Sequence, residues 1–167
     1  EAALSAGSYG TWRAALGGGG QWGPLNAIAA LSRFRTDGYR DHSAATRDHL
    51  NAKLRYRLSA DTALTVVANS LRQPDTQDPL GLSRADFEAN PRRVHPNALL
   101  LNTRKTVNQD QVGAALGHRL GQGRLEATLY GGEHFVEQFH AIPVAFQAPA
   151  THSGGVVNLD RGYGGGA

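Results

Sequence analysis

The 167-residue sequence contains neither cysteine nor methionine. Without cysteine, the chain can form neither a disulfide framework nor a cysteine-ligated metal site. It also lacks a recognisable signal peptide and any apolar run near the roughly 18 residues that indicate a membrane-spanning helix. These absences do not exclude spanning β-strands, because such a strand needs only about 9–11 residues and leaves a weak hydropathy signal.

Strong charge of one sign is missing as well. The sequence has 17 basic and 14 acidic residues, for a formal charge of +3, and the two signs are interleaved. This balance is too weak and too mixed to indicate nucleic-acid binding. Aromatic residues make up only 7% of the chain, whereas apolar residues reach 40% and glycine occurs 21 times. The length suits one domain with a sizeable core. Since the sequence starts at Glu1 and holds no methionine, we expect it to begin after processing or at an internal cut.

The clearest pattern lies in residues 47–59, where every second residue is apolar. A strand would place these residues on one face: Leu50, Ala52, Leu54, Tyr56 and Leu58. The opposite face would be polar and strongly basic: Arg47, His49, Asn51, Lys53, Arg55 and Arg57. This alternation predicts a β-strand, since a helix would scatter both sets. One face is too basic to bury and the other too apolar for water, so a wall between lipid and an aqueous lumen fits both.

Similar segments recur along the chain, and together they predict an all-β, antiparallel up-and-down meander of seven or eight strands. The expected strands cover residues 2–7, 9–16, 25–36, 47–59, 63–71, 103–120, 125–130 and 156–167. Glycines 17–20 are interpreted as a turn, because glycine weakens a strand interior. The orientation of the strand at 25–36 stays open, since apolar residues occur on both of its faces.

Residues 73–102 are expected to form a long loop. Pro74, Pro79, Pro91 and Pro96 within it forbid continuous strand ladders. Ser83 three residues before Asp86 predicts one short helix at 83–89 that ends at Asn90.

The predicted connections alternate in length. The short ones are residues 17–23, 59–62 and 120–123, and the long ones are 37–46, 73–102 and 137–155. In a meander, successive connections emerge at opposite ends, so one end would carry short turns and the other long loops, as in outer-membrane barrels. Trp22 and Tyr56 would then lie near the short-turn rim.

Four segments also match a known family: residues 7–13 (GSYGTWR), 36–43 (TDGYRDHS), 78–82 (DPLGL) and 102–106 (NTRKT). Their order and spacing resemble TonB-dependent outer-membrane receptors, and in particular the branch that includes the pyrroloquinoline quinone receptor, with ferric-siderophore receptors as the wider group. The resemblance covers essentially the whole chain. It implies a 22-stranded transmembrane barrel with an N-terminal plug, of which residues 1–167 would form one partial barrel domain without the plug and the remaining strands.

The resemblance further implies a function in active uptake. The expected ligand is a ferric siderophore or a similar scarce anionic cofactor such as pyrroloquinoline quinone, and the expected location is the outer membrane of a Gram-negative cell. The partners would be outer-membrane lipid and, through the plug, TonB. The chain would be a receptor and not an enzyme, with no cofactor of its own. The alternative is a secreted or surface β-domain whose long loops serve binding or adhesion.

Candidate ligand-binding residues are Arg40, His42, Arg104 and Lys105, because both pairs would lie at the long-loop end. Cations there would attract an anionic ligand, although ordinary solvated charge also explains them. The seven histidines show no metal-site spacing, so no metal site is expected. No nucleophile-elbow or phosphate-loop motif occurs, and the acidic residues near 75–88 fit a solvated loop better than a catalytic pair.

Overall fold

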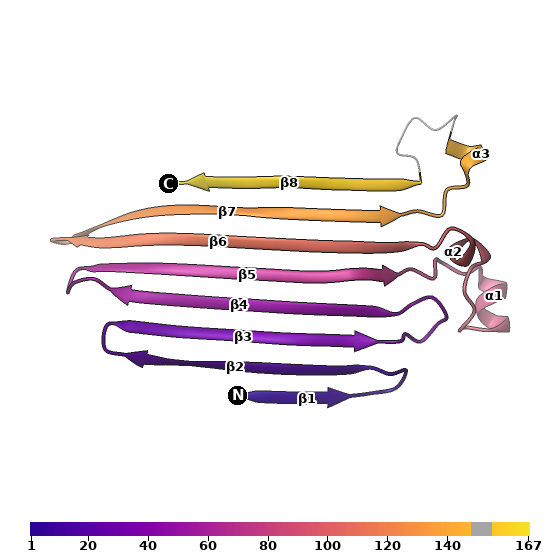
Figure 1. Ribbon diagram of the computed structural model, residues 1–167, viewed down its shortest axis with the longest axis horizontal. Coiled ribbons are helices and arrows are strands. Elements are labelled where there is room, and N and C mark those ends of the chain that lie inside the picture. The colour runs from indigo at the N-terminus through magenta and orange to yellow at the C-terminus, as the bar shows by residue number, and fades with distance from the viewer. Residues whose placement is uncertain (148–154) are drawn as a thin grey trace.

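The computed structural model describes residues 1–147 and 155–167, which form a single antiparallel sheet with strands in the order β1-β2-β3-β4-β5-β6-β7-β8 (Figure 1). This confirms the all-β, up-and-down meander expected from the sequence. The strands are β1 (Ala2–Ala6), β2 (Trp12–Trp22), β3 (Leu25–Thr36), β4 (Ala45–Arg57), β5 (Thr62–Gln77), β6 (Arg104–Leu120), β7 (Gly123–Phe139) and β8 (Val156–Gly166).

In the described part of the long connections there are three short helices, where the sequence predicted one. The predicted helix is α1 (Arg84–Ala89), with Ser83 as its N-cap and Asn90 as its C-cap. The others are α2 (Pro96–Leu100) and α3 (Val144–Gln147). In α2, His95 caps the N-terminus and Pro96 occupies the first turn, where its missing N–H costs nothing. Pro96 therefore begins a helix, whereas the sequence analysis used it only as a strand breaker.

The prediction of a turn at glycines 17–20 is wrong. These glycines lie inside β2 and pair with residues 27–30 of β3, from Gly17 opposite Ala30 to Gly20 opposite Ala27. The turn is Gly23-Pro24, between Trp22 and Leu25. Pairing with β3 overrides the weak strand propensity of glycine, and close packing favours it: a Cβ on Gly19 would lie only 2.4 Å from the Ala27 carbonyl oxygen.

Two strands run further than predicted. β5 continues past Leu71 to Gln77 because the ladder with β6 absorbs Pro74 and Asp75 in an irregularity between Gln73 and Thr76. A bulge is one of the few places where a sheet tolerates proline, so Pro74 does not end the strand. β7 likewise runs to Phe139, although a loop was expected from residue 137.

Short turns and long loops lie at opposite ends of the sheet, as predicted. The short turns follow β2, β4 and β6, and the longer connections follow β1, β3, β5 and β7 (Figure 1). Gly23 and Gly121 adopt positive φ in two of the short turns, a conformation that suits glycine. The end with the turns is called the short-turn end below, and the other the long-loop end.

The described residues contain almost no hydrophobic core. Only Ala98, Thr103 and Gly113 are buried, and the first two belong to the long connection between β5 and β6. Large apolar side chains on the strands are open, including Leu129 at 70% exposure and Leu54 at 46%. A sheet normally buries at least one face against another layer. Here no second layer covers either face.

Candidate functional site: two sheet faces and a loop cluster

The strand register assigns every side chain to one of two faces. Residues directly opposite one another in a ladder point to the same side, and neighbours along a strand point to opposite sides. Asn26, Arg55 and Thr65 lie in one such row and share a face. The register also settles the orientation of β3, because Ile28 and Phe34 share that face, whereas Leu31 and Arg33 lie on the other.

The apolar face is the side of the sheet that carries Leu54. Its apolar part runs from the short-turn end to Leu31 on β3, Leu50 on β4, Val112 on β6 and Leu129 on β7, and it is almost free of charge. Along β4 and the following turn, the distance from Leu50 to Leu58 is about 27 Å. The members on β3 to β7 are Leu25, Ala27, Ala29, Leu31, Leu50, Ala52, Leu54, Tyr56, Leu64, Val66, Ala68, Val112, Ala114, Leu116, Leu125, Ala127 and Leu129.

Paired charges begin where the apolar rows end. Arg33 donates two hydrogen bonds of 2.6 Å to the Asp48 carboxylate. Arg72 lies opposite Asp48 on the next strand and forms an ion pair of 2.5 Å with Asp110. Arg33, Asp48 and Arg72 share one ladder row, and Asp110 lies one row nearer the short-turn end, opposite Ser70; together these four residues are called the ion-pair row. All four side chains are at least one-third exposed, so the row adds little stability by itself. It does define a sharp boundary between apolar and charged surface.

The opposite side of the sheet, called the cationic face, carries most of the basic strand residues. Glu126 is the only acidic residue that the strand register places there, and it pairs with Arg124 at 2.6 Å. The basic residues on this face are Arg13, Arg47, Lys53, Arg55, Arg57, Lys105, Arg119, Arg124 and Arg161. The net charge of the whole chain did not reveal this segregation, because the acidic strand residues lie mainly on the other side of the sheet, at or beyond the level of Leu31 and Leu50.

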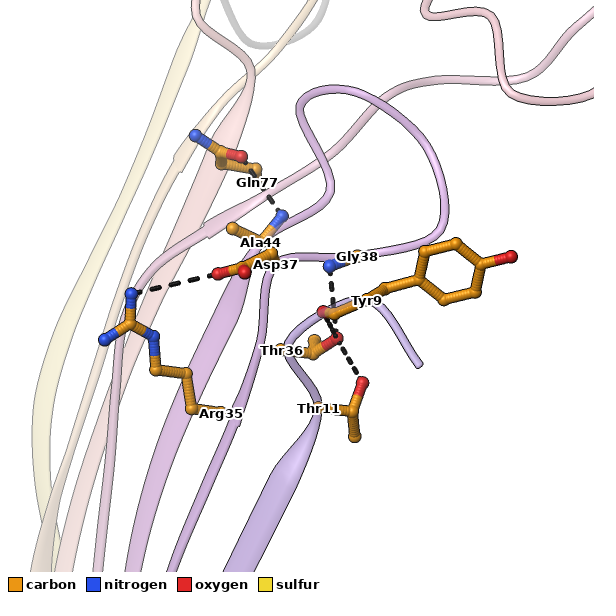
Figure 2. Close-up of polar contacts among 8 residues, drawn as sticks. All are labelled: Tyr9, Thr11, Arg35, Thr36, Asp37, Gly38, Ala44 and Gln77. Atoms are coloured by element: carbon orange, nitrogen blue, oxygen red, sulfur yellow. Dashed lines mark hydrogen bonds and ion pairs between the residues drawn. The ribbon is translucent and has the colours of Figure 1, made fainter. Parts of the chain in front are cut away.

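At the long-loop end, the first two connections join through a small network of hydrogen bonds. The Thr11 and Thr36 hydroxyls are 2.7 Å apart (Figure 2). The Asp37 N–H donates to the Tyr9 carbonyl at 2.9 Å. Gly38 closes this turn at φ +89°, and a Cβ there would collide with Ser43. The residues that resemble the receptor family at 7–13 and 36–43 thus contact one another.

Arg40 ties the second connection to the third. Its guanidinium donates to three backbone carbonyls: those of Pro79 at 3.1 Å, Leu80 at 2.6 Å and Arg93 at 2.9 Å. All three guanidinium nitrogens, Nε, Nη1 and Nη2, therefore donate to protein atoms. The geometry assigns Arg40 a loop-organising role, and direct ligand contact by Arg40 stays a prediction.

His42 and Thr103 complete this connection. A ring nitrogen of His42 lies 2.8 Å from the Thr103 carbonyl oxygen. The Thr103 side chain is buried and donates to the Asp78 carbonyl, while the Asp78 N–H donates back to Thr103. Residues 7–11, 37–44 and 78–103 are therefore one packed unit, which we call the loop cluster.

The loop cluster also contains a group of two tyrosines and an arginine that the sequence did not predict. The rings of Tyr9 and Tyr39 meet edge to face at a centroid distance of 5.3 Å. The Arg92 guanidinium lies over both rings, 5.3 Å from Tyr9 and 5.9 Å from Tyr39, and donates to the Tyr39 carbonyl. Each residue comes from a different connection, so no local pattern could reveal the group.

Arg104 and Lys105 lie at the long-loop end but on opposite faces of β6. Arg104 pairs with Asp75 at 3.2 Å and stacks 3.6 Å from the centroid of the Phe139 ring. Lys105 lies opposite Gln138 and Thr76 on the cationic face. The structure therefore brings His42 near Arg104 through Thr103, but it does not direct Arg104 and Lys105 to one point.

Other kinds of site find no support among the described residues. No group of three or more histidine or acidic side chains there could hold a metal ion. No helix in the same part of the chain is long and apolar enough to cross a membrane. A comparison of the sequence with models of known protein families found no match.

Proposed function

We propose that this chain forms part of the barrel wall of a TonB-dependent outer-membrane receptor. In this proposal, the sheet curves into a 22-stranded barrel completed by further strands. The apolar face contacts outer-membrane lipid, and the cationic face lines an aqueous lumen that holds a plug through which TonB acts. The ligand is a scarce anionic chelate or cofactor, of the ferric-siderophore or pyrroloquinoline quinone type.

The observation that carries the proposal is the pair of uncovered faces. One is apolar over about 27 Å of strand, which is the scale of the roughly 25 Å apolar band of outer-membrane barrels. The other is cationic and exposed, which would be costly to bury in a core. A wall between lipid and water gives each face a suitable environment. The alternation of short turns and long loops supports the same arrangement.

Anion capture fits the long-loop end and the cationic face. Lys105 lies on this face, two residues from Thr103 of the loop cluster, and Arg40 and His42 hold the connections of that cluster together. Cations on a partly enclosed surface raise the local concentration of an anionic ligand. Direct arginine or lysine contacts to carboxylates would then fix its position. Arg104, which stacks on Phe139, would support the mouth from the other side of the wall.

A pair of neighbouring substitutions tests which face meets lipid. In the full-length receptor, we expect Leu54→Arg to lower the free energy of unfolding by roughly 2–4 kcal/mol, because it places a charge near the bilayer midplane. Arg55→Leu is the matched control, one residue away on the lumen face, and it should cost far less. Both values come from reversible unfolding in phospholipid vesicles. Equal costs would show that the faces are misassigned.

Function is tested by a binding screen of the full-length receptor against ferric siderophores and pyrroloquinoline quinone, followed by uptake into cells with and without TonB. We expect saturable binding of one anionic ligand and uptake that requires TonB. A protein that stays soluble and monomeric without detergent, yet binds another macromolecule through its loops, would favour the surface β-domain instead.

A further inference from the structure

A hollow of about 910 Å³ lies on the cationic face at the short-turn end, far from the loop cluster. Small side chains of β5 and β6 form its floor: Ala63, Thr65, Ala115 and Gly117. Basic side chains from β4, β6 and β7 form its walls: Lys53, Arg55, Arg57, Arg119 and Arg124. The site thus combines an open hollow with an excess of basic side chains.

Basic residues outnumber acidic residues in the lining of the hollow. Its lining holds five basic residues and only two acidic ones, Asp61 and Glu126. Glu126 is already paired with Arg124 at 2.6 Å. Arg119 lies directly opposite Arg124 in the ladder between β6 and β7, and like charges in that position destabilise a sheet. A negatively charged guest would relieve this repulsion.

The basic residues of the hollow come from strands on both of its sides. β4 and β7 are separated by three strand spacings, or about 14 Å. The Arg124 side chain reaches inward over the floor, because a Cβ on Gly117 would lie 3.1 Å from its terminal nitrogen. From the other side, Arg57 lies in the same ladder row as Ala63 and Gly117. A guest with anionic groups at two ends could therefore contact the basic residues of both sides at once.

We propose that this hollow binds a multivalent oxyanion, a molecule with two or more phosphate or carboxylate groups. Arg55 and Arg57 bind one end, and Arg119 and Arg124 bind the other. The inference rests on the proposed function in placing the cationic face in the lumen, and it requires that the plug leave this hollow open to solvent. It adds a second anion site at the short-turn end, separate from the loop residues Arg40 and His42.

The test uses the full-length receptor in a neutral detergent. Binding is measured by isothermal titration calorimetry with two probes, inorganic pyrophosphate and citrate. We expect saturable binding with one site per chain. Arg55→Gln and Arg119→Gln should each weaken it about tenfold, as for loss of one charge-assisted hydrogen bond. Arg47→Gln is the matched control: it removes the same charge from the same face of β4, but at the long-loop end, and should change affinity less than about twofold.

A second variant separates a shaped site from diffuse charge. Gly117→Leu fills the floor without changing any charge, and we expect it to abolish binding of both probes. Arg119→Gln removes the like-charge pair of Arg119 and Arg124, so this variant should fold at least as well as the wild type. The test therefore stays decisive even if the Arg55→Gln variant does not fold. Binding of only one probe supports the proposal and identifies the anionic group.

Two results would overturn the proposed anion site. One is the absence of saturable binding of either probe, and the other is an equal loss of probe affinity in Arg47→Gln and Arg55→Gln. The proposed function fails separately. A receptor that inserts into lipid and takes up its ligand, but binds neither probe, lacks only this second site. A protein that binds pyrophosphate and citrate in the hollow but never inserts into lipid keeps the site and loses the receptor assignment.

Discussion

Arg40 shows how one residue type can serve two roles that the sequence does not distinguish. Its charge and loop position predicted contact with an anionic ligand, yet the structure directs its donors to the carbonyls of Pro79, Leu80 and Arg93. Those partners lie 39 to 53 positions away along the chain. The connection lengths were enough to predict that Arg40 lies at the long-loop end. Its hydrogen-bond partners, however, depend on how loops that are far apart in the sequence fold together.

We expect Arg40→Ala to loosen the loop cluster. Each hydrogen bond from a charged donor contributes roughly 1.5–3 kcal/mol, so the free energy of local opening should fall by about that amount or more. Hydrogen exchange at the His95 amide, which donates to Pro79, reports it. Arg84→Ala is the control, since Arg84 pairs only within α1, with Glu88. Equal exchange in the two variants would contradict a loop-organising role for Arg40.

At the scale of elements, alternation was a reliable guide, whereas glycine and proline correctly marked the turn at Gly121 and the helix end before Pro91 but misled at three other positions. β3 has the bounds that the sequence predicted, and β4 lies within two residues of its predicted limits. The errors at Gly17, Pro74 and Pro96 share a cause. Each was interpreted from its intrinsic preference, but β2 gains its ladder from β3, β5 absorbs proline in a bulge, and α2 uses proline in its first turn.

The glycines of β2 differ in their surroundings, which gives a matched pair of substitutions. A Cβ at Gly19 would lie 2.4 Å from the Ala27 carbonyl oxygen and 2.9 Å from the Ile28 Cα, whereas one at Gly18 would meet nothing within 4 Å. We expect Gly19→Ala to cost about 1–3 kcal/mol through overpacking. Gly18→Ala should be neutral or stabilise by up to about 1 kcal/mol, because it restricts the unfolded chain. Urea unfolding of the full-length protein in vesicles measures both, and equal effects would be evidence against close β2–β3 packing.

At the scale of the molecule, the described sheet is open, since β1 pairs only with β2 and β8 only with β7. Exposed strand edges are templates for pairing with other chains, and the apolar face adds a surface that water does not favour. The 40% apolar composition anticipated a sizeable core, but composition does not reveal whether apolar residues face inward or outward.

We therefore expect the isolated 167-residue chain to aggregate in plain buffer and to become monomeric in detergent micelles. Sedimentation velocity in both conditions measures this directly, with the same concentration of chain in each. A monomer in plain buffer with a sharp, cooperative unfolding transition would contradict the account of two uncovered faces.

The ion-pair row has a consequence for how such a wall would sit in a bilayer. Arg33, Asp48 and Arg72 lie immediately beyond the row of Leu31 and Leu50, toward the long-loop end, and Asp110 lies on β6 at the level of that row. A shift of the wall by two residues along its strands would draw these charges into hydrocarbon, where each arginine costs roughly 2–4 kcal/mol near the midplane and less near the interface. The ion-pair row would therefore limit how deeply the long-loop end of the wall can enter the bilayer. In this way it would set the height of the loop cluster above the lipid.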